Sequence, residues 1–285
     1  MDKPILDFLV IGAQKSGTTW LSHVLGQHEE IHVPKRKELH YFNESVNLAK
    51  GLGWYRAQFR PAPGERLLGE ATPNYFWTRP LPGDRHSPMH RFGIGPLVRA
   101  INPDARLILS LRDPVDRAVS AYYHYIATGL IDPRLPFSEA LPWFGTRSMG
   151  LYAVHYRHWL ESFDREQILT LIFERDIKEQ ANQPATVRRL FDHLGLSTPE
   201  TLEYDEARNS RPSYFAMRTA RHVPHDSIPG KLIRGACSAM MPARLDARFK
   251  PVVPAEEKAR LREYYRPHNA ELSELLGYDV SRHWI

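Results

Sequence analysis

The chain has 285 residues, of which 42% are hydrophobic and 25% charged, and this composition excludes a disordered or low-complexity protein. It contains no run of about 18 apolar residues that could span a bilayer. Its net charge of +5 is spread along the chain rather than gathered into a stripe that would bind nucleic acid. The single cysteine, Cys237, excludes an internal disulfide, and the first residues do not form a signal peptide. We therefore expect a soluble cytoplasmic protein that binds neither nucleic acid nor membrane.

The predicted elements begin with an apolar, branched run over residues 5–11, which indicates a buried strand ending at Gly12. After a polar loop, the spacing of apolar residues predicts a helix over residues 18–28. Residues 67–71 form a short strand candidate, and the Pro-, Gly-, Arg- and His-rich segment 78–95 is expected to be a loop at one rim of the sheet.

The second half repeats the alternation of strand and helix. Residues 106–111 are a short buried-strand candidate, and Pro114 opens an amphipathic helix. A further strand is predicted over residues 167–173, between helices over about 151–163 and 185–194. Near-continuous apolar strands that alternate with helices are typical of a parallel sheet covered on both faces.

The C-terminal part divides into a segment without a period and a final helix. Residues 205–254 mix Arg, Pro and scattered hydrophobic residues, which indicates long loops or short helices, and helical spacing returns over residues 256–276. There is no internal repeat and no linker composition. We therefore predict an α/β fold with a central parallel sheet and helices on both faces, as one domain over residues 1–285.

The most informative stretch is residues 12–20, which read Gly-Ala-Gln-Lys-Ser-Gly-Thr-Thr-Trp. A glycine at a strand end, followed by Lys15 and a helix start, builds a nest of backbone N–H groups that suits a phosphate. The stretch is similar to a P-loop, but the lysine of a Walker motif follows the second glycine, whereas Lys15 precedes Gly17. A turn of this kind, with glycine and a threonine cap, also occurs without a ligand.

Residues 12–20 resemble the 5′-phosphosulfate loop of sulfotransferases that use 3′-phosphoadenosine 5′-phosphosulfate (PAPS). This resemblance implies a P-loop-like phosphosulfate loop in the predicted fold. The residues that would bind the cofactor here are Lys15, Ser16, Gly17, Thr18 and Thr19.

A second match lies about a hundred residues further on. Arg112-Asp113-Pro114, with Ser120 eight residues after Arg112, is similar to the segment of this family that binds the 3′-phosphate. Arg112 ends a predicted strand at the edge where α/β sheets bind ligands, and Ser120 lies two helical turns on, facing back. Each residue alone would be read as a salt-bridged turn or a surface serine.

A third match identifies a candidate general base. Residues 68–76 resemble the strand and turn of the glycosaminoglycan (heparan sulfate-type) branch that contains Glu-x-Thr-Pro-x-Tyr-Phe, and the resemblance implies that Glu70 is the base. A partly desolvated carboxylate at a strand end can take a proton from an acceptor hydroxyl or amine. The alternative is a structural carboxylate that pairs with a nearby arginine.

Two further segments resemble the same branch. Residues 150–155 place Tyr152 where family members contact the nucleotide, and Trp20 matches the position where cytosolic members stack an aromatic ring on adenine. Both residues could instead be core aromatics. Residues 37–42 resemble a segment near the active site, which implies that Lys37 lies close to the sulfuryl group or the acceptor, unless it is an ordinary solvated lysine.

The chain also departs from the family pattern. The Arg-Lys-Gly loop of the cytosolic enzymes has no clear counterpart, since residues 208–211 match it poorly, and the cysteine pair and membrane anchor of the secreted enzymes are absent. The resemblance therefore favours a soluble, bacterial-like member. Neither the identity of the acceptor nor the oligomeric state can be read from the sequence.

The implied function is transfer of a sulfuryl group from PAPS to a hydroxyl or amine of a glycan or small molecule, leaving 3′,5′-ADP. Glu70 would remove the acceptor proton, and Lys15 would stabilise the leaving phosphate with the N–H groups of residues 16–19. No metal is expected, because the histidines and the lone cysteine do not have the spacing of metal ligands.

Two alternatives stay open at this stage. A P-loop kinase would need Mg²⁺ and an acidic residue at a strand end, where the chain instead has Arg112 followed by Asp113. A nucleotide-binding module without catalysis would use the same phosphate cradle.

Overall fold

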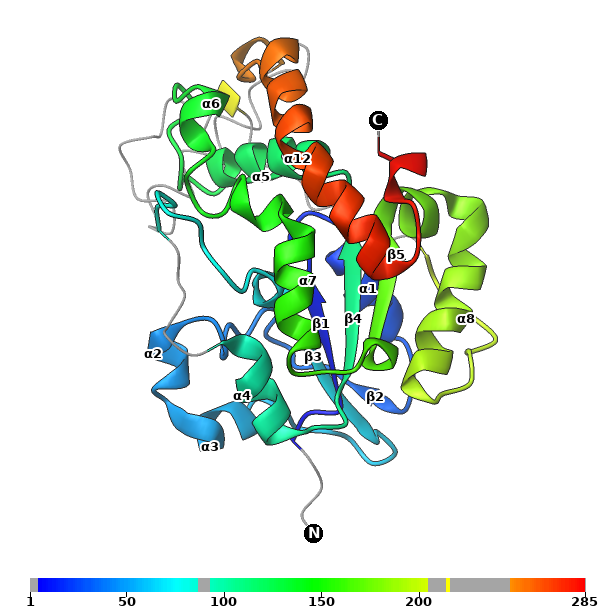
Figure 1. Cartoon of the computed structure of the whole chain (residues 1–285). Helices are drawn as coiled ribbons and strands as arrows, with labels where there is room; N and C mark the ends of the chain where they lie inside the picture. The colour runs from blue at the N-terminus through cyan, green and yellow to red at the C-terminus, as the bar shows by residue number, and fades with distance from the viewer. Residues whose placement is uncertain (1–4, 87–92, 205–213, 216–246, 285) are drawn as a thin grey trace.

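The computed structural model describes residues 5–86, 93–204, 214–215 and 247–284 (Figure 1). A parallel sheet lies at its centre, with the strand order β2-β3-β1-β4-β5. The strands are β1 (Phe8–Gly12), β2 (Ile31–His32), β3 (Leu67–Ala71), β4 (Arg106–Leu111) and β5 (Ile168–Ile172).

Helices cover both faces of the sheet, as predicted (Figure 1). Helices α4, α7 and α12 lie on one face, and α1 and α8 lie on the other. The helices are α1 (Thr18–Leu25), α2 (Ser45–Leu48), α3 (Gly51–Arg56), α4 (Ile94–Ile101), α5 (Pro114–Ala127), α6 (Phe137–Ala140), α7 (Tyr152–Leu160), α8 (Gln183–Leu194) and α12 (Ala255–Leu276), with a π-helical turn η4 (Phe173–Lys178) and short 3-10 turns that include η1 (Pro73–Phe76).

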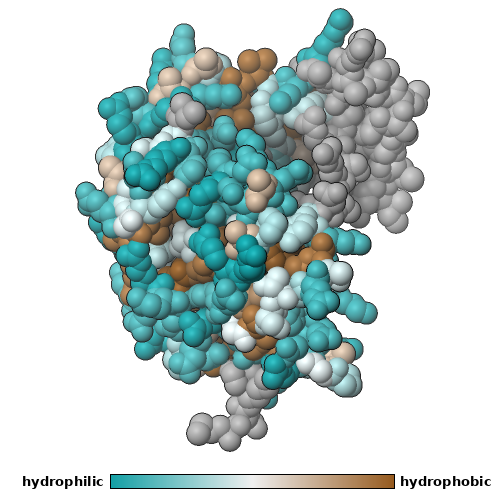
Figure 2. All heavy atoms as spheres, turned by 90° about the vertical axis from the view of Figure 1, so that its right-hand side faces the viewer, coloured by the Kyte–Doolittle hydropathy of each residue, from teal (hydrophilic) through white to brown (hydrophobic). Residues whose placement is uncertain are grey.

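Strand β1 shows why the strands read as continuous apolar runs. Leu9 and Ile11 pack into the core beneath α4 and α7, while Phe8 and Val10 pack into the core beneath α1 and α8. Successive side chains of a strand point to opposite faces, so a strand buried on both sides needs apolar residues at every position. Hydrophilic residues cover most of the molecular face shown in Figure 2. In the part of the chain that the structure describes, no helix is long and apolar enough to cross a bilayer.

The predicted elements are present, and their bounds differ from the prediction by at most three residues. The strands over residues 67–71 and 106–111 and the helix that opens at Pro114 begin as predicted. The prediction missed β2, α2, α3 and α6, because elements of two to six residues show no hydrophobic period. It also missed α4, which begins inside the segment 78–95 that was expected to be a loop. The segment 78–95 is described except for residues 87–92, and most of segment 205–254, with Cys237, lies outside the described residues.

The sheet topology determines where the site forms. Because β1 is central and all five strands are parallel, the loops after β1, β3 and β4 leave the same edge of the sheet. The chain runs from β1 to β2 and β3 on one side and then to β4 and β5 on the other. Ligands of open α/β sheets bind at such a reversal, outside the carboxyl ends of the strands.

Candidate active site

The loop from Gly12 to Gly17 connects β1 to α1 and has the geometry of an anion-binding cradle. Gly17 is left-handed, with φ +83°, and a Cβ there would lie 2.9 Å from Cδ2 of Phe173, so the chain requires glycine. Lys15 is left-handed as well. No side chain caps α1, so its first-turn N–H groups can donate to an anion.

The residues after Lys15 line this cradle. Ser16 is fully buried, and its Oγ has no hydrogen-bond partner among the described residues. A buried hydroxyl without a partner is costly in a native structure, and a bound ligand would satisfy it. Thr18 is buried, and Thr19 Oγ1 accepts a hydrogen bond of 2.7 Å from Lys37 Nζ. The structure therefore brings the predicted loop residues and Lys37 together.

Arg112 joins the same site from the end of β4. Its Nη1 donates to the carbonyl oxygen of Lys15 at 3.3 Å, and its guanidinium carbon lies 5.1 Å from the centre of the Phe173 ring. Its Nε is buried and has no partner among the described residues. Burial, together with the nearby charge of Arg112, lowers the pKa of Lys15. Two cations therefore face one cradle, which suits an anion carrying more than one negative charge.

Helix α5 follows Arg112 directly. Asp113 caps it by accepting a hydrogen bond of 2.8 Å from Asp116 N, so this carboxylate serves the helix start. Asp113 follows the strand end at which a P-loop kinase would need an acidic residue, and its role as a helix cap explains its presence there. Ser120 lies two turns along α5 and is partly exposed.

The two aromatic residues predicted to contact the nucleotide are both buried. Trp20 is 3% exposed, belongs to the core beneath α1 and α8, and donates its indole N–H to the carbonyl oxygen of Tyr204 at 3.1 Å. Tyr152 is 1% exposed, and its hydroxyl donates to the carbonyl oxygen of Arg112 at 2.8 Å. Their positions fit the core alternative, in which Tyr152 supports the site only by fixing the backbone of Arg112.

Glu70 lies at the end of β3, but its environment does not suit the predicted role of general base. It is 2% exposed, and its carboxylate accepts four hydrogen bonds. The donors are Leu39 N (3.2 Å), Thr72 Oγ1 (2.8 Å), Tyr55 Oη (2.9 Å) and Tyr75 Oη (2.8 Å). Burial raises the pKa of Glu70. Since both oxygens are already occupied, an acceptor hydroxyl cannot reach them, and the carboxylate pairs with hydroxyl and amide groups rather than with the expected arginine.

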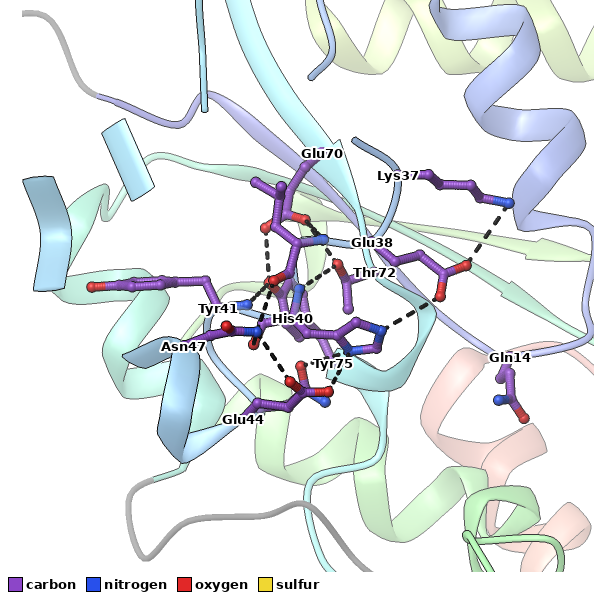
Figure 3. Close-up of polar contacts among 12 residues, drawn as sticks. Gln14, Lys37, Glu38, His40, Tyr41, Glu44, Asn47, Glu70, Thr72 and Tyr75 are labelled. Atoms are coloured by element: carbon purple, nitrogen blue, oxygen red, sulfur yellow. Dashed lines mark hydrogen bonds and ion pairs between the residues drawn. The ribbon is translucent and has the colours of Figure 1, made fainter. Parts of the chain in front are cut away.

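A different carboxylate, Glu38, lies between Lys37 and His40 (Figure 3), close enough to the cradle for its charge to act on Lys15. Its side chain is 37% exposed and contacts Lys37 Nζ at 3.8 Å and His40 Nε2 at 3.5 Å. Partial burial alone would raise the pKa of Glu38, but the His40 hydrogen bond and the Lys37 charge outweigh it, so this pKa is lowered. Glu38 is therefore ionised at neutral pH and accessible, which are the two requirements for a general base.

Sequence reasoning passed over Glu38, although it had singled out the segment 37–42 for its lysine. The available signal was Glu38 itself, a carboxylate adjacent to Lys37. Glu70 received the assignment because residues 68–76 resemble the Glu-x-Thr-Pro-x-Tyr-Phe segment of the family.

Two histidines lie near this carboxylate. The pKa of His40 is raised, because contacts with Glu38 and Glu44 outweigh its burial. On α5, burial and the charge of Lys15 lower the pKa of His124 to about 4, so its ring is neutral at pH 7. Across the described ranges, three or more His, Cys, Asp or Glu side chains never gather in a group that could hold a metal ion.

Comparison with known proteins identifies the family. The chain matches the sulfotransferase domain model over residues 6–268, and it therefore belongs to the sulfotransferase domain family. The predicted resemblance is confirmed.

Individual relatives include enzymes of heparan sulfate. The chain is 28% identical, over 97% of its length, to human heparan sulfate glucosamine 3-O-sulfotransferase 3B1, of which it spans 65%. It is 29% identical, over 95% of its length, to human heparan sulfate glucosamine 3-O-sulfotransferase 6, of which it spans 72%. The chain thus spans about two thirds of these relatives.

Solved structures give the same fold. A sulfotransferase from Alicyclobacillus acidocaldarius superposes with a TM-score of 0.66 at 25% identity, over 99% of both chains. Mouse sulfotransferase SULT7A1, solved in complex with PAP, superposes with a TM-score of 0.50 at 13% identity, over 97% of this chain and 89% of its own. The predicted α/β sulfotransferase fold is confirmed.

Proposed function

We propose that the chain transfers a sulfuryl group from PAPS to a hydroxyl or amine of a saccharide. The observation that carries this proposal is a line of contacts from Thr19 through Lys37 and Glu38 to His40. It connects the start of α1, where an anion would bind, to an accessible carboxylate. A nucleotide-binding module without catalysis would need the anion site at the start of α1 but not the accessible carboxylate.

The residues of the cradle fit the sulfuryl donor. Lys15, the buried Ser16 hydroxyl and the first-turn N–H groups of α1 would hold its 5′-phosphosulfate. Arg112 and Ser120 would hold its 3′-phosphate, with the unpartnered Nε of Arg112 as one donor. When bound, the donor supplies an electrophilic sulfur and a phosphate leaving group.

In this proposal Glu38 replaces Glu70 as the general base. Glu38 takes the proton of the acceptor hydroxyl while the acceptor oxygen forms its bond to sulfur and the bond from sulfur to the phosphate oxygen breaks. Lys15 stabilises the negative charge left on that phosphate oxygen, with the α1 N–H groups as further donors. His40 keeps Glu38 ionised and oriented, and Lys37 lies between the base and the cradle.

The choice of a saccharide rests on the relatives, two of which are named for the 3-O-sulfation of heparan sulfate glucosamine. A small-molecule acceptor would use the same base and the same cradle. The segment 208–211, which sequence comparison offered as a poor counterpart of the Arg-Lys-Gly loop, lies outside the described residues.

The first experiment is calorimetric titration with 3′,5′-ADP, with 5′-ADP and ATP as controls, all without Mg²⁺, and with ATP repeated in the presence of Mg²⁺. We expect selective binding of 3′,5′-ADP that is lost in Arg112→Ala. Tighter binding of ATP that appears only with Mg²⁺ would instead support a kinase.

The second experiment tests transfer itself. The purified protein is incubated with ³⁵S-labelled PAPS and a panel of glucosamine-containing oligosaccharides, phenols and alcohols. We expect label in the saccharides. Nucleotide binding without label in any acceptor would favour the module without catalysis.

A further inference from the structure

The segment that carries Glu38 has an unfavourable backbone conformation. Glu38 and His40 both adopt left-handed conformations, with φ values of 58° and 52°. Residues with a Cβ rarely adopt this conformation, and it persists only where surrounding contacts enforce it. The segment therefore needs ties from outside itself.

These ties come from residues 70–75, on β3 and the 3-10 turn after it (Figure 3). The N–H of Leu39 donates to Glu70 Oε2 at 3.2 Å, and the N–H of His40 lies 3.4 Å from Thr72 Oγ1. The N–H of Tyr41 donates to Tyr75 Oη at 2.9 Å. Three consecutive backbone amides are thus each held by a side chain of one neighbouring segment.

Glu70 organises all three contacts. The hydroxyls of Thr72 and Tyr75 both donate to its carboxylate, so their lone pairs are left to accept the amides of residues 40 and 41. Tyr55 supplies a further donor. Because these side chains are at most 2% exposed, water cannot easily replace any of them.

We propose that Glu70 is a positioning residue that acts through Glu38: with Thr72 and Tyr75 it clamps the backbone of residues 39–41 and so aims the Glu38 carboxylate at the cradle. The inference rests on the proposed function, in which Glu38 is the general base. A misplacement of about 1 Å at a reacting group can cost 10²-fold in rate.

The first test measures the clamp without any activity. Amide hydrogen exchange is followed in wild type, in Glu70→Gln and in Asp7→Asn. Asp7 is the matched control, since its carboxylate accepts a β3 backbone amide, Leu68 N at 2.7 Å, where β3 begins. We expect loss of protection at residues 39–41 in Glu70→Gln alone. Unchanged protection there would overturn the clamp whatever the protein catalyses.

The second test asks whether Glu70 acts through Glu38. The rate kcat with PAPS is compared among Glu70→Gln, Glu38→Gln and the double variant, with 3′,5′-ADP affinity as a binding check. We expect Glu70→Gln to lower kcat about 10²-fold at unchanged 3′,5′-ADP affinity. We also expect the double variant to match Glu38→Gln, because residues that act as one unit are not additive.

The outcomes separate the two proposals. Multiplied losses in the double variant would show that Glu70 acts independently of Glu38, and would overturn the positioning role. A fully active Glu38→Gln would overturn the base assignment, while the exchange result would still report on the clamp. If Glu70→Gln does not fold, Tyr75→Phe keeps the ring and removes the tie to Tyr41 together with one of the donors to Glu70. Its expected result is lost protection at residue 41 with a smaller fall in kcat, and unchanged values of both would overturn the clamp.

Discussion

Glu38 and Glu70 lie in neighbouring segments but have different surroundings. Glu38 is partly exposed between Lys37 and His40, whereas Glu70 is buried among hydroxyl and amide donors. Burial raises the pKa of Glu70, while the His40 hydrogen bond and the Lys37 charge lower that of Glu38. The two carboxylates are therefore suited to different tasks, Glu70 to positioning and Glu38 to proton transfer.

Removing the base should affect the rate but not nucleotide binding. We expect Glu38→Gln to lower kcat by about 10²- to 10⁴-fold, with the 3′,5′-ADP affinity measured by calorimetry unchanged. Lys15→Ala should lower both, because in the proposed function Lys15 holds the phosphosulfate before and during the reaction. Glu44→Gln is the control, since Glu44 also lies near His40 but is not placed at the cradle. A Glu44 variant as impaired as the Glu38 variant would contradict the assignment.

The pH dependence should follow His40. The lowered pKa of Glu38 depends on the His40 hydrogen bond, so His40→Gln should move the acid limb of kcat/KM that belongs to Glu38 toward higher pH. The same pKa shift contributes stability above the unfolded-state pKa, about 4.3, which is lost as pH falls through the folded-state value. Acid unfolding of His40→Gln should accordingly begin at higher pH. The rate profile and circular dichroism measure the two effects, and coincident wild-type and variant curves would refute the prediction.

Much of the site can be predicted from the sequence, because motif spacing fixes it. Lys15, Ser16 and Arg112 meet at one cradle because they follow the parallel strands β1 and β4. The carboxylate suited to proton transfer could not be chosen in this way. The sequence does not reveal that two tyrosine hydroxyls from different elements meet at Glu70, nor that Glu38 stays exposed.

At the scale of elements, the loop before α1 depends on its contact with η4. Gly17 packs against Phe173 and Ile177 of that turn, and a Cβ would lie 2.9 Å and 3.0 Å from their nearest atoms. The loop and η4 therefore have to fit together closely before the first turn of α1 can present its N–H groups.

Gly17→Ala should lower the thermal unfolding midpoint beyond the effect of backbone strain. The matched control is Gly83→Ala, because Gly83 has a similar φ of +89° but no atom lies within 4 Å of the point that its Cβ would occupy. We expect the free energy of unfolding of Gly17→Ala to fall by about 1–3 kcal/mol more than that of the control, as is usual for overpacking. Calorimetric scans of both variants measure the difference, and equal losses would show that η4 moves aside.

The long elements other than α4 were predictable and the short ones were not. Strand β4 and helix α5 have clear periods and a proline at the helix start. Strand β2 has two residues and is ordered by its pairing with β3, a contact between segments far apart in the chain. Local pattern carries no information about such a pairing.

At the scale of the whole molecule, two cores share one sheet. Helix α12 closes the core that lies beneath α4 and α7, and Leu272 is fully buried there. The final helix is therefore part of the domain that holds the site.

Shortening the Leu272 side chain should destabilise the whole domain. We expect Leu272→Ala to cost about 2–5 kcal/mol in the free energy of unfolding, and Leu130→Ala, at a residue 52% exposed, to stay within about 0.5 kcal/mol. Urea titration followed by tryptophan fluorescence measures both. A wild-type midpoint for Leu272→Ala would show that α12 is not coupled to the core.

The central position of β1 has a consequence for how such an enzyme diversifies. The proposed donor contacts come from the loop after β1 and from its β4 side, and the proposed base and its clamp lie on its β3 side. In the described part of the chain, the two groups meet at this strand, at the loop that follows it and at the hydrogen bond from Lys37 to Thr19. Mutations can therefore accumulate on the β3 side and create new acceptor preferences while the donor pocket is inherited intact, so a lineage can change what it modifies without having to reinvent how it is supplied.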